Sequence, residues 1–168
     1  MIYKHIADVE AKPTFSKCLK YRYRLDISLK TAAKYQTKTV CAIMQNPSVA
    51  DSDIADKSVQ FLEKLVFAKN TPRFSGVRKL IVVNQFAFIQ TKEFSGRDKH
   101  IGQDNDRHIK EAITESDIIL IAWGKSNAYE ARRQAINRML ENCNKVLLQG
   151  KSHPSRASYD EYTSVYSI

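Results

Sequence analysis

Four short apolar runs are the strongest pattern along the chain. Each run lacks the strict alternation of a half-exposed strand, so each predicts a β-strand that is buried on both faces. The runs are Thr39–Met44, Lys79–Asn84, Asp117–Ala122 and Lys145–Gln149. Strands of this kind occur mainly in parallel sheets whose two faces are covered by helices.

Helical periodicity occupies the stretches between these runs. The apolar spacing predicts three helices, from about Lys57 to Lys69, from Asp104 or Asn105 to Glu115, and from about Asn127 to Asn142. Asp56 is placed to cap the first of them. Strands that alternate with helices imply right-handed β-α-β units. We therefore expect the α/β class, with a three-layer α/β/α sandwich around a mainly parallel, four-stranded central sheet.

The N-terminal part of the chain departs from this rhythm. The stretch Tyr21–Ile27 alternates apolar and polar positions, which predicts a half-exposed antiparallel strand at the edge of the sheet. No internal repeat, low-complexity tract or Gly/Ser linker divides the sequence. We therefore expect a single domain that spans residues 1–168.

Composition favours an anionic partner. The 168 residues include 27 Lys and Arg against 18 Asp and Glu, which gives a formal net charge of +9. A hydrophobic fraction of 43% argues against a disordered basic tail. No apolar run approaches the roughly 20 residues of a membrane span, and the first residues do not form a signal peptide. We therefore expect a cytoplasmic protein with no membrane partner. The sequence leaves the oligomeric state open.

The cysteines and histidines do not follow a metal-ligand pattern. Cys18, Cys41 and Cys143 are far apart, and no Cys-x-x-Cys spacing occurs. A structural zinc site or a four-cysteine iron–sulfur cluster requires more ligands at closer spacing. We therefore expect no metal site and no cofactor.

A polar segment follows each of the four expected strands. Ligands of parallel α/β sheets bind outside the carboxyl ends of the strands, so these segments are candidates for a site. They are Gln45–Ser48, Asn84–Phe86, Trp123–Ser126 and Gly150–Ser155. Two of them contain Gly-Lys-Ser, but a P-loop also needs a glycine five positions before its Gly-Lys pair. Ile119 and Lys145 occupy those positions, which disfavours a P-loop.

Three of these segments together resemble the motifs of the uracil-DNA glycosylase superfamily. Gln45–Ser48 is similar to its Gly-Gln-Asp-Pro or Gly-Ile-Asn-Pro loop, and His153-Pro154-Ser155 is similar to its late His-Pro-Ser motif. Asn84 ends a strand in the manner of the residue that reads the base edge, and Trp123-Gly124 resembles the Leu-Leu-Trp-Gly strand. Taken singly, each segment is also an ordinary turn or strand end.

A second resemblance points to an uncharacterised family of bacteria and mobile elements, domain of unknown function 1643. It is carried by Asn46–Asp51, Ile101–Asp106 and Ala122–Gly124. This family name fixes no reaction. The two resemblances are compatible if the family is a divergent branch of the glycosylase fold.

The glycosylase resemblance implies a pocket for a base that is flipped out of the stack. It implies that Asn46 holds the attacking water and that His153 donates to the developing oxyanion of the leaving base, as catalytic or vestigial residues. Phe86 or Phe88 would stack on the base. The implied base pocket consists of Gln45, Pro47, Ser48, Asn84 and Phe86.

Several departures from the glycosylase motifs argue against catalysis. The amide of Asn46 cannot take up a proton, and Met44 replaces a glycine of the first motif. Ser48 stands where a bulky Tyr excludes thymine, and Arg156 follows where a Leu wedge is usual. We therefore expect a pseudo-glycosylase that binds nucleic acid with weak or no glycosylase activity. The alternatives are an active, divergent DNA base-excision glycosylase and a protein-interaction module of a mobile element.

Basic residues supply candidate contacts to the backbone of DNA or structured RNA. We expect these contacts to be Lys151, Ser155, Arg156, Arg22 and Arg24. The last two belong to a cluster with Lys17, Lys20, Tyr21 and Tyr23, which suits nucleic acid but equally suits a charged edge strand that prevents edge pairing. By contrast, Arg132, Arg133 and Arg138 lie among glutamates and predict an ordinary solvated helix face.

Overall fold

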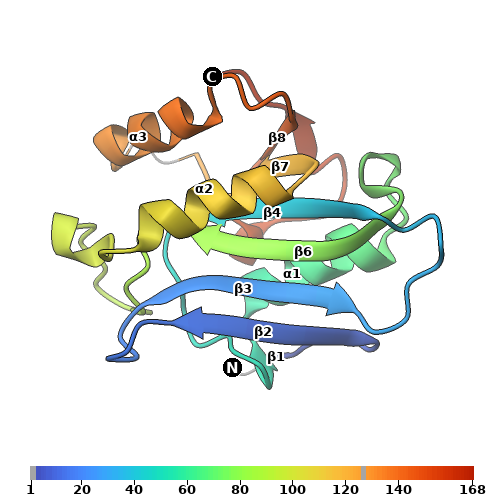
Figure 1. Cartoon of the computed structure of the whole chain (residues 1–168), viewed down its shortest axis with the longest axis horizontal. Helices are drawn as coiled ribbons and strands as arrows, with labels where there is room; N and C mark the ends of the chain where they lie inside the picture. The colour runs from blue at the N-terminus through green and yellow to red at the C-terminus, as the bar shows by residue number, and fades with distance from the viewer. Residues whose placement is uncertain (1–2, 126–127) are drawn as a thin grey trace.

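A seven-stranded mixed sheet forms the centre of the protein. The computed structural model describes residues 3–125 and 128–168, and Figure 1 shows the arrangement of its elements. The strand order is β2-β3-β6-β4-β7-β8-β9. The strands are β2 (Val9–Phe15), β3 (Arg22–Leu29), β4 (Lys38–Met44), β6 (Val77–Asn84), β7 (Ile118–Ile121), β8 (Val146–Gly150) and β9 (Thr163–Val165). A separate antiparallel pair consists of β1 (Tyr3–Lys4) and β5 (Ile54–Ala55).

The four strands expected from the apolar runs are confirmed. β4 pairs in parallel with β6 on one side and with β7 on the other, and β7 pairs in parallel with β8. The expectation of a four-stranded, mainly parallel sheet is wrong, because antiparallel strands extend it at both sides. β2 contains Lys12 and Pro13, and β9 has three residues, so neither produces an apolar run. The α/β class itself is confirmed.

Helices cover both faces of the sheet. They are α1 (Lys57–Glu63) with a following π-helical turn (Lys64–Ala68), α2 (Asn105–Glu115) and α3 (Glu130–Leu140), besides 3-10 turns at Pro72–Phe74, Asp98–His100 and Pro154–Arg156. On one face, Val59 and Leu62 of α1 belong to the same buried apolar cluster as Val82 of β6. On the other face, Ile109 of α2 and Ile136 of α3 join a second cluster. Within the described residues, no helix has the length and apolar character that crossing a membrane requires.

The helix boundaries follow the sequence pattern closely. The side chain of Asp56 caps α1 as expected, because it accepts a hydrogen bond from the backbone N–H of Val59 at 2.8 Å. The second helix ends at Glu115, also as expected. Asn127, the expected start of the third helix, lies outside the described residues, and the structure places α3 at Glu130–Leu140.

The expectation of a half-exposed edge strand near the N-terminus is wrong. β3 lies between β2 and β6, so neighbouring strands pair with both of its sides. Thr14 and Phe15 are adjacent in β2, whereas their partners Arg24 and Arg22 are separated by Tyr23, which is the extra residue of a β-bulge. The bulge interrupts the alternation, and all three β3 residues are buried.

Candidate functional site

The carboxyl ends of the four parallel strands meet at one edge of the sheet. In Figure 1 this edge lies on the left, where the arrowhead of β6 points. Because β3 runs antiparallel to β6, the turn between β2 and β3 lies at the same edge. We call this edge the rim. It comprises residues 45–48, 85–90, 123–125 and 151–156 after the parallel strands, and residues 16–21 of the β2–β3 turn.

Asn46 is tied to the neighbouring rim segment. Its Nδ2 donates hydrogen bonds to the backbone oxygens of Gln90 at 2.7 Å and Pro47 at 3.3 Å. The backbone N–H of Gln90 in turn donates to the oxygen of Pro47 at 3.2 Å. Pro47 is buried, and Gln45 and Ser48 are half-buried. These contacts engage both hydrogens of the Asn46 amide and hold the two segments against each other.

Asn84, at the end of β6, is buried beside a cation. Its Oδ1 accepts a hydrogen bond from Nη2 of Arg22 at 3.5 Å, whereas no described residue bonds to its Nδ2. Nη1 of Arg22 donates to the oxygen of Ala50 at 2.7 Å, and its Nε has no described partner. Burial lowers the pKa of Arg22 to about 10, although the more distant charges of Asp56 and Asp51 oppose this shift. The end of β6 therefore contains unpartnered donors and a buried positive charge.

His153 lies half-buried against the backbone of Gly124. A Cβ atom at Gly124, where φ is +84°, would lie 3.3 Å from the Cβ of His153, so the glycine permits this close approach. Nδ1 of His153 accepts a hydrogen bond from the backbone N–H of Ser155 at 3.3 Å and lies 2.9 Å from its Oγ. Burial, and secondarily the charge of Arg156, lowers the pKa of His153. The ring is therefore neutral at pH 7 with its proton on Nε2, a donor that no described residue engages.

Phe86 is packed inside an aromatic cluster. Its ring is 2% exposed and makes edge-to-face contacts with Phe94 and Tyr129, whose ring centres lie 5.2 Å and 5.1 Å away. Phe88 stacks on His100 with a centre-to-centre distance of 4.9 Å. The structure thus brings the residues of the expected base pocket to one rim, but the packing leaves neither Phe86 nor the buried Asn84 accessible.

The five residues that were expected to contact the nucleic-acid backbone fall into two groups. Lys151 and Arg156 are exposed at the rim, and Ser155 beside them is half-buried. Arg22 and Arg24 do not reach the surface, since their exposed fractions are 0% and 8%. The expectation that these two arginines form an exposed basic cluster is wrong.

Arg24 belongs to an ion-pair network on the face of the sheet that α2 covers. Its guanidinium pairs with Asp26 at 2.6 Å and with Glu115 of α2 at 3.0 Å, and Lys79 pairs with Asp26 at 2.8 Å. Arg22 instead contacts Ala50, which belongs to the apolar cluster on the opposite face. The bulge in β3 explains this separation, because it breaks the alternation that would place both arginines on one face.

The arginines of α3 do not form the expected solvated face. Arg132 is 7% exposed, and its Nε donates to the oxygen of Gln85 at 2.6 Å while Nη2 pairs with Asp106 at 2.6 Å. Arg133 is half-buried, whereas Arg138 is exposed. The interpretation is therefore wrong for the first two residues, whose side chains reach back to the rim.

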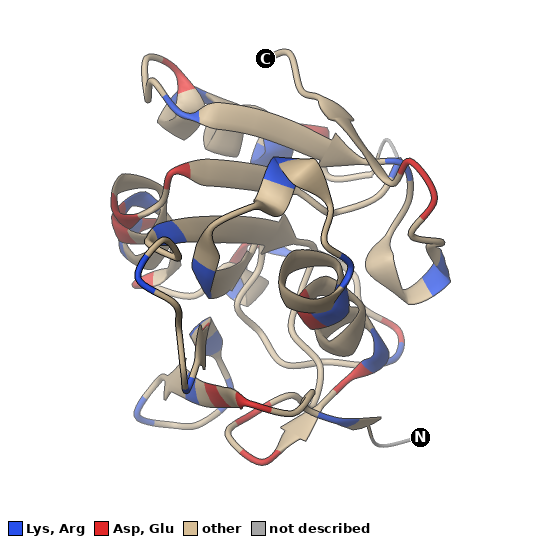
Figure 2. Ribbon diagram, turned by 90° about the vertical axis from the view of Figure 1, so that its right-hand side faces the viewer, with Lys and Arg blue, Asp and Glu red and all other residues tan. Residues whose placement is uncertain are grey.

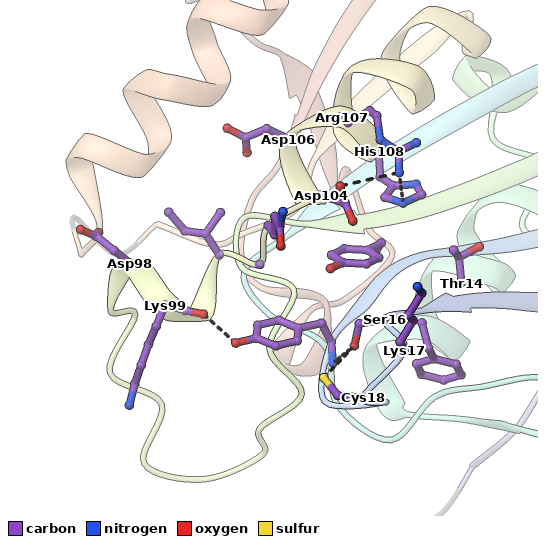
Figure 3. A pocket seen from close by; sticks show the side chains of 16 residues that line it. Thr14, Ser16, Lys17, Cys18, Asp98, Lys99, Asp104, Asp106, Arg107 and His108 are labelled. Atoms are coloured by element: carbon purple, nitrogen blue, oxygen red, sulfur yellow. Dashed lines mark hydrogen bonds and ion pairs between the residues drawn. The ribbon is translucent and has the colours of Figure 1, made fainter.

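A groove of about 1060 Å³ lies between the β2–β3 turn and residues 98–108 (Figure 3). The hydroxyl of Tyr21 donates to the backbone oxygen of Lys99 at 2.9 Å and so joins its two walls. Within the groove, the ring of Tyr23 stacks on His108 at 4.8 Å. A Cβ atom at Gly102, where φ is +90°, would lie 3.0 Å from the ring of Tyr21, so the glycine lets the rings approach.

Sequence reasoning singled out several residues of this groove but did not place them together. It named Lys17, Tyr21 and Tyr23 as a basic and aromatic cluster and Ile101–Asp106 as a family segment, but it did not predict the stacking of Tyr23 on His108 or the role of Gly102. A glycine between two polar segments is the only local signal for that close approach. Within the described residues, no group of three His, Cys, Asp or Glu side chains is placed to hold a metal ion.

These features define a mixed-sheet α/β protein with a polar rim at the carboxyl ends of its parallel strands. A family model described as protein of unknown function (DUF1643) matches residues 22–156, which is most of the chain. The chain therefore belongs to the DUF1643 family. Neither the curated proteins nor the solved structures yielded a match to it.

Proposed function

We propose that this DUF1643 protein binds DNA or structured RNA along the rim and has weak or no glycosylase activity. The groove in Figure 3 carries the proposal, because an aromatic ring and lysine side chains line the same cavity. The resemblance of the rim segments to the uracil-DNA glycosylase superfamily supports a nucleic-acid ligand. The net charge of +9 supports a polyanionic one.

Tyr21 suits a stacking platform for a base. Its hydroxyl is fixed to the Lys99 oxygen at 2.9 Å, and its ring meets Phe88 edge-to-face at 5.4 Å. Lys17 and Lys99 line the groove, and Lys20 follows in the same turn. None of these three lysines forms an ion pair within the described residues. Stacking on a ring combined with phosphate contacts from nearby cations is how many proteins bind single strands.

Three carboxylates also line the groove and limit its positive charge. Asp106 is paired with Arg132 at 2.6 Å, and Asp104 lies 3.9 Å from Arg107. Asp98 is the third. We therefore expect stacking to contribute a large share of the affinity, and we expect a salt dependence weaker than that of a wholly basic site.

Positive charge is not confined to the rim. Figure 2 views the molecule from the side of the amino ends of the parallel strands, and it shows Lys and Arg on several elements with Asp and Glu among them. Charge alone therefore does not single out a binding face. A control that changes the same charge at the opposite end of the sheet is needed in any binding test.

The contacts around Asn46 and Asn84 support weak or absent excision. The hydrogen bonds from Nδ2 of Asn46 to the oxygens of Gln90 at 2.7 Å and Pro47 at 3.3 Å would have to break before this amide nitrogen could donate to an attacking water. The departing base leaves a positively charged sugar, which the neutral amide of Asn46 does not stabilise as a carboxylate would. Binding in the groove requires neither step.

The direct test is fluorescence anisotropy with labelled single-stranded DNA, duplex DNA and hairpin RNA at several salt concentrations. We expect the affinity to fall as salt rises, and to fall about tenfold in Lys17→Glu with Lys99→Glu. Lys30→Glu with Lys34→Glu is the matched control at the opposite end of the sheet. Tyr21→Leu should also weaken binding about tenfold, whereas Tyr21→Phe, which keeps the ring, should not. An affinity that is independent of salt and of these changes would overturn the proposal.

An active glycosylase is the second candidate, because one observation favours it. Nδ2 of Asn84 and Nε2 of His153 are donors that no described residue engages. Oligonucleotides that carry uracil or a mismatch should be incubated with the protein and assayed for abasic sites. Product that His153→Ala abolishes would establish the enzyme and replace our proposal. Absence of any nucleic-acid binding would instead favour the protein-interaction module.

A further inference from the structure

A second hollow, of about 450 Å³, opens at the rim where β7 and β8 end. Three cationic side chains line it, from Lys125, Arg133 and Lys151, together with one carboxylate, from Glu130. That carboxylate accepts a hydrogen bond from Gln134 at 3.1 Å. Three positive charges against one negative charge leave an excess of two.

Arg133 is held at the wall of this hollow. Its guanidinium lies 5.5 Å from the centre of the Trp123 ring. Nη2 donates to the oxygen of Gly124 at 3.4 Å, and Nε has no described partner although solvent does not reach it. A planar guanidinium with unengaged donors is suited to bind two oxygens of one phosphate group.

Lys151 and Asn137 add further donors. The amine of Lys151 lies 3.5 Å from a carboxylate oxygen of Glu161, but both side chains are largely exposed, so this pair holds the amine weakly. Tyr166 donates its hydroxyl to Oδ1 of Asn137 at 2.9 Å, which leaves the amide nitrogen of Asn137 as a donor. Both of these residues line the hollow.

We propose that this hollow binds a phosphomonoester, either at the end of a nucleic-acid strand or on a free nucleotide. A phosphomonoester carries about two negative charges near neutral pH, which matches the excess of two, whereas each phosphate within a strand carries one. A volume of about 450 Å³ is within the range of small-ligand pockets. The proposal that the ligand is the end of a nucleic-acid strand rests on the proposed function. The proposal that the hollow binds a small phosphomonoester does not.

Trp123 provides the readout, because it lines the hollow and is the only tryptophan in the sequence. Its fluorescence should be followed while ribose 5-phosphate is added at constant ionic strength, with sodium chloride as the control. We expect a saturable change in the wild type. The affinity of Arg133→Met for ribose 5-phosphate should be at least about tenfold lower, because this variant loses the charge-assisted hydrogen bonds. Arg138→Met, on an exposed residue of the same helix, should bind like the wild type.

Arg133→Lys adds a second variant that keeps the charge but loses the planar fork, and we expect intermediate binding. Thermal unfolding should show that all variants are folded at the temperature of the titration. A fluorescence change that does not saturate, or that is identical in wild type and Arg133→Met, would overturn the inference.

Strand ends are tested with one oligonucleotide carrying a 5′-phosphate, a 3′-phosphate or hydroxyls at both ends. We expect a phosphorylated end to bind more tightly and Arg133→Met to remove that gain. If the hydroxyl-ended strand binds with salt dependence while neither end phosphate nor ribose 5-phosphate adds anything, the inference fails and the proposed function stands. If ribose 5-phosphate binds through Arg133 but no strand binds, the hollow is a free-nucleotide site and the proposed function fails.

Discussion

Nη2 of Arg22 lies 3.5 Å from Oδ1 of Asn84, and neither side chain has any exposed surface. Arg22 begins β3 and Asn84 ends β6, so the contact joins two neighbouring strands directly beside the rim. Removing a guanidinium from water is costly, and no described carboxylate forms an ion pair with this one. The oxygens of Asn84 and Ala50 offset only part of that cost. The pair therefore places an unfavourable buried charge directly beside the rim.

A double-mutant cycle tests whether this pair acts as a unit. We expect Asn84→Leu to lower the free energy of unfolding by about 1–3 kcal/mol, because Arg22 loses an acceptor while it stays buried. Arg22→Met combined with Asn84→Leu should recover most of the loss, since the charge leaves together with its partner. Urea unfolding of the wild type, both single variants and the double variant gives the coupling energy. Simply additive losses would contradict the coupling.

Asn46 should stabilise the rim through its hydrogen bonds to Gln90 and Pro47. Asn46→Ala removes both donors, and we expect the free energy of unfolding to fall by about 1 kcal/mol. Asn46→Asp should be less stable still, because a carboxylate would face two backbone oxygens. Ser48→Ala, a change in the same half-buried segment, should stay within about 0.5 kcal/mol of the wild type. Equal urea midpoints for the wild type and Asn46→Asp would show that these contacts do not hold the segments together in solution.

Substitutions of Arg24 and Lys17 should separate effects on the free energy of unfolding from effects on nucleic-acid affinity. Arg24→Gln breaks the pairs with Asp26 and Glu115, so we expect a loss of about 1–3 kcal/mol in stability and no change in the nucleic-acid affinity of the folded protein. Lys17→Glu, on an exposed lysine of the groove, should weaken binding and leave the unfolding midpoint unchanged. Anisotropy and urea unfolding of the same samples give both quantities. Weaker binding by a fully stable Arg24→Gln protein would place Arg24 at the ligand after all.

His5 should make the stability of the protein depend on pH. Its Nδ1 lies 2.5 Å from Oε1 of Glu63, a fully buried side chain, and this hydrogen bond raises the pKa of His5 above 6.5. The folded-state pKa exceeds the unfolded one, so the stabilisation is complete below about pH 6.5 and is lost as pH rises through the folded-state pKa. We expect the wild type to lose stability relative to His5→Gln as pH rises above about 6.5 and through the folded-state pKa. If the free energies of unfolding of the two proteins changed in parallel with pH, this assignment would be contradicted.

The parallel strands could be predicted because burial on both faces determines their composition. Every residue of β7, Ile118–Ile121, is apolar and buried, and the pattern needs no knowledge of the rest of the fold. The antiparallel strands lack such a signal, since β2 carries charges at Glu10 and Lys12 and a proline at Pro13. Their place in the sheet depends on pairing between distant segments.

The same limit applies to the candidate site. Strand ends place Asn46 and His153 at the rim, and this could be read from their positions after apolar runs. The burial of Arg22 depends on a bulge that only the pairing of β3 with β2 creates, so periodicity within β3 cannot show it. Arg132 likewise appears solvated among charges, whereas its bond to the Gln85 oxygen arises from how α3 packs against the rim.

Cys18 lines the groove and allows a direct test of its occupancy. The thiol is exposed, and a hydrogen bond with Ser16 at 3.3 Å lowers the pKa of Cys18. By contrast, burial raises the pKa of Cys41 to about 12, and Cys143 is half-buried in the turn after α3. Because the thiolate is the reactive form, we expect iodoacetamide to alkylate Cys18 first.

Nucleic acid bound in the groove should then slow the alkylation of Cys18 and leave the rate at Cys143 unchanged. Peptide mass spectrometry at several times, with Cys18→Ser to verify the assignment, gives the rate at each thiol. The comparison between the two cysteines controls for any effect of the oligonucleotide on the reagent. Equal rates at Cys18 with and without a saturating oligonucleotide would mean that the strand binds elsewhere, because a base stacked on Tyr21 would cover this side of the turn.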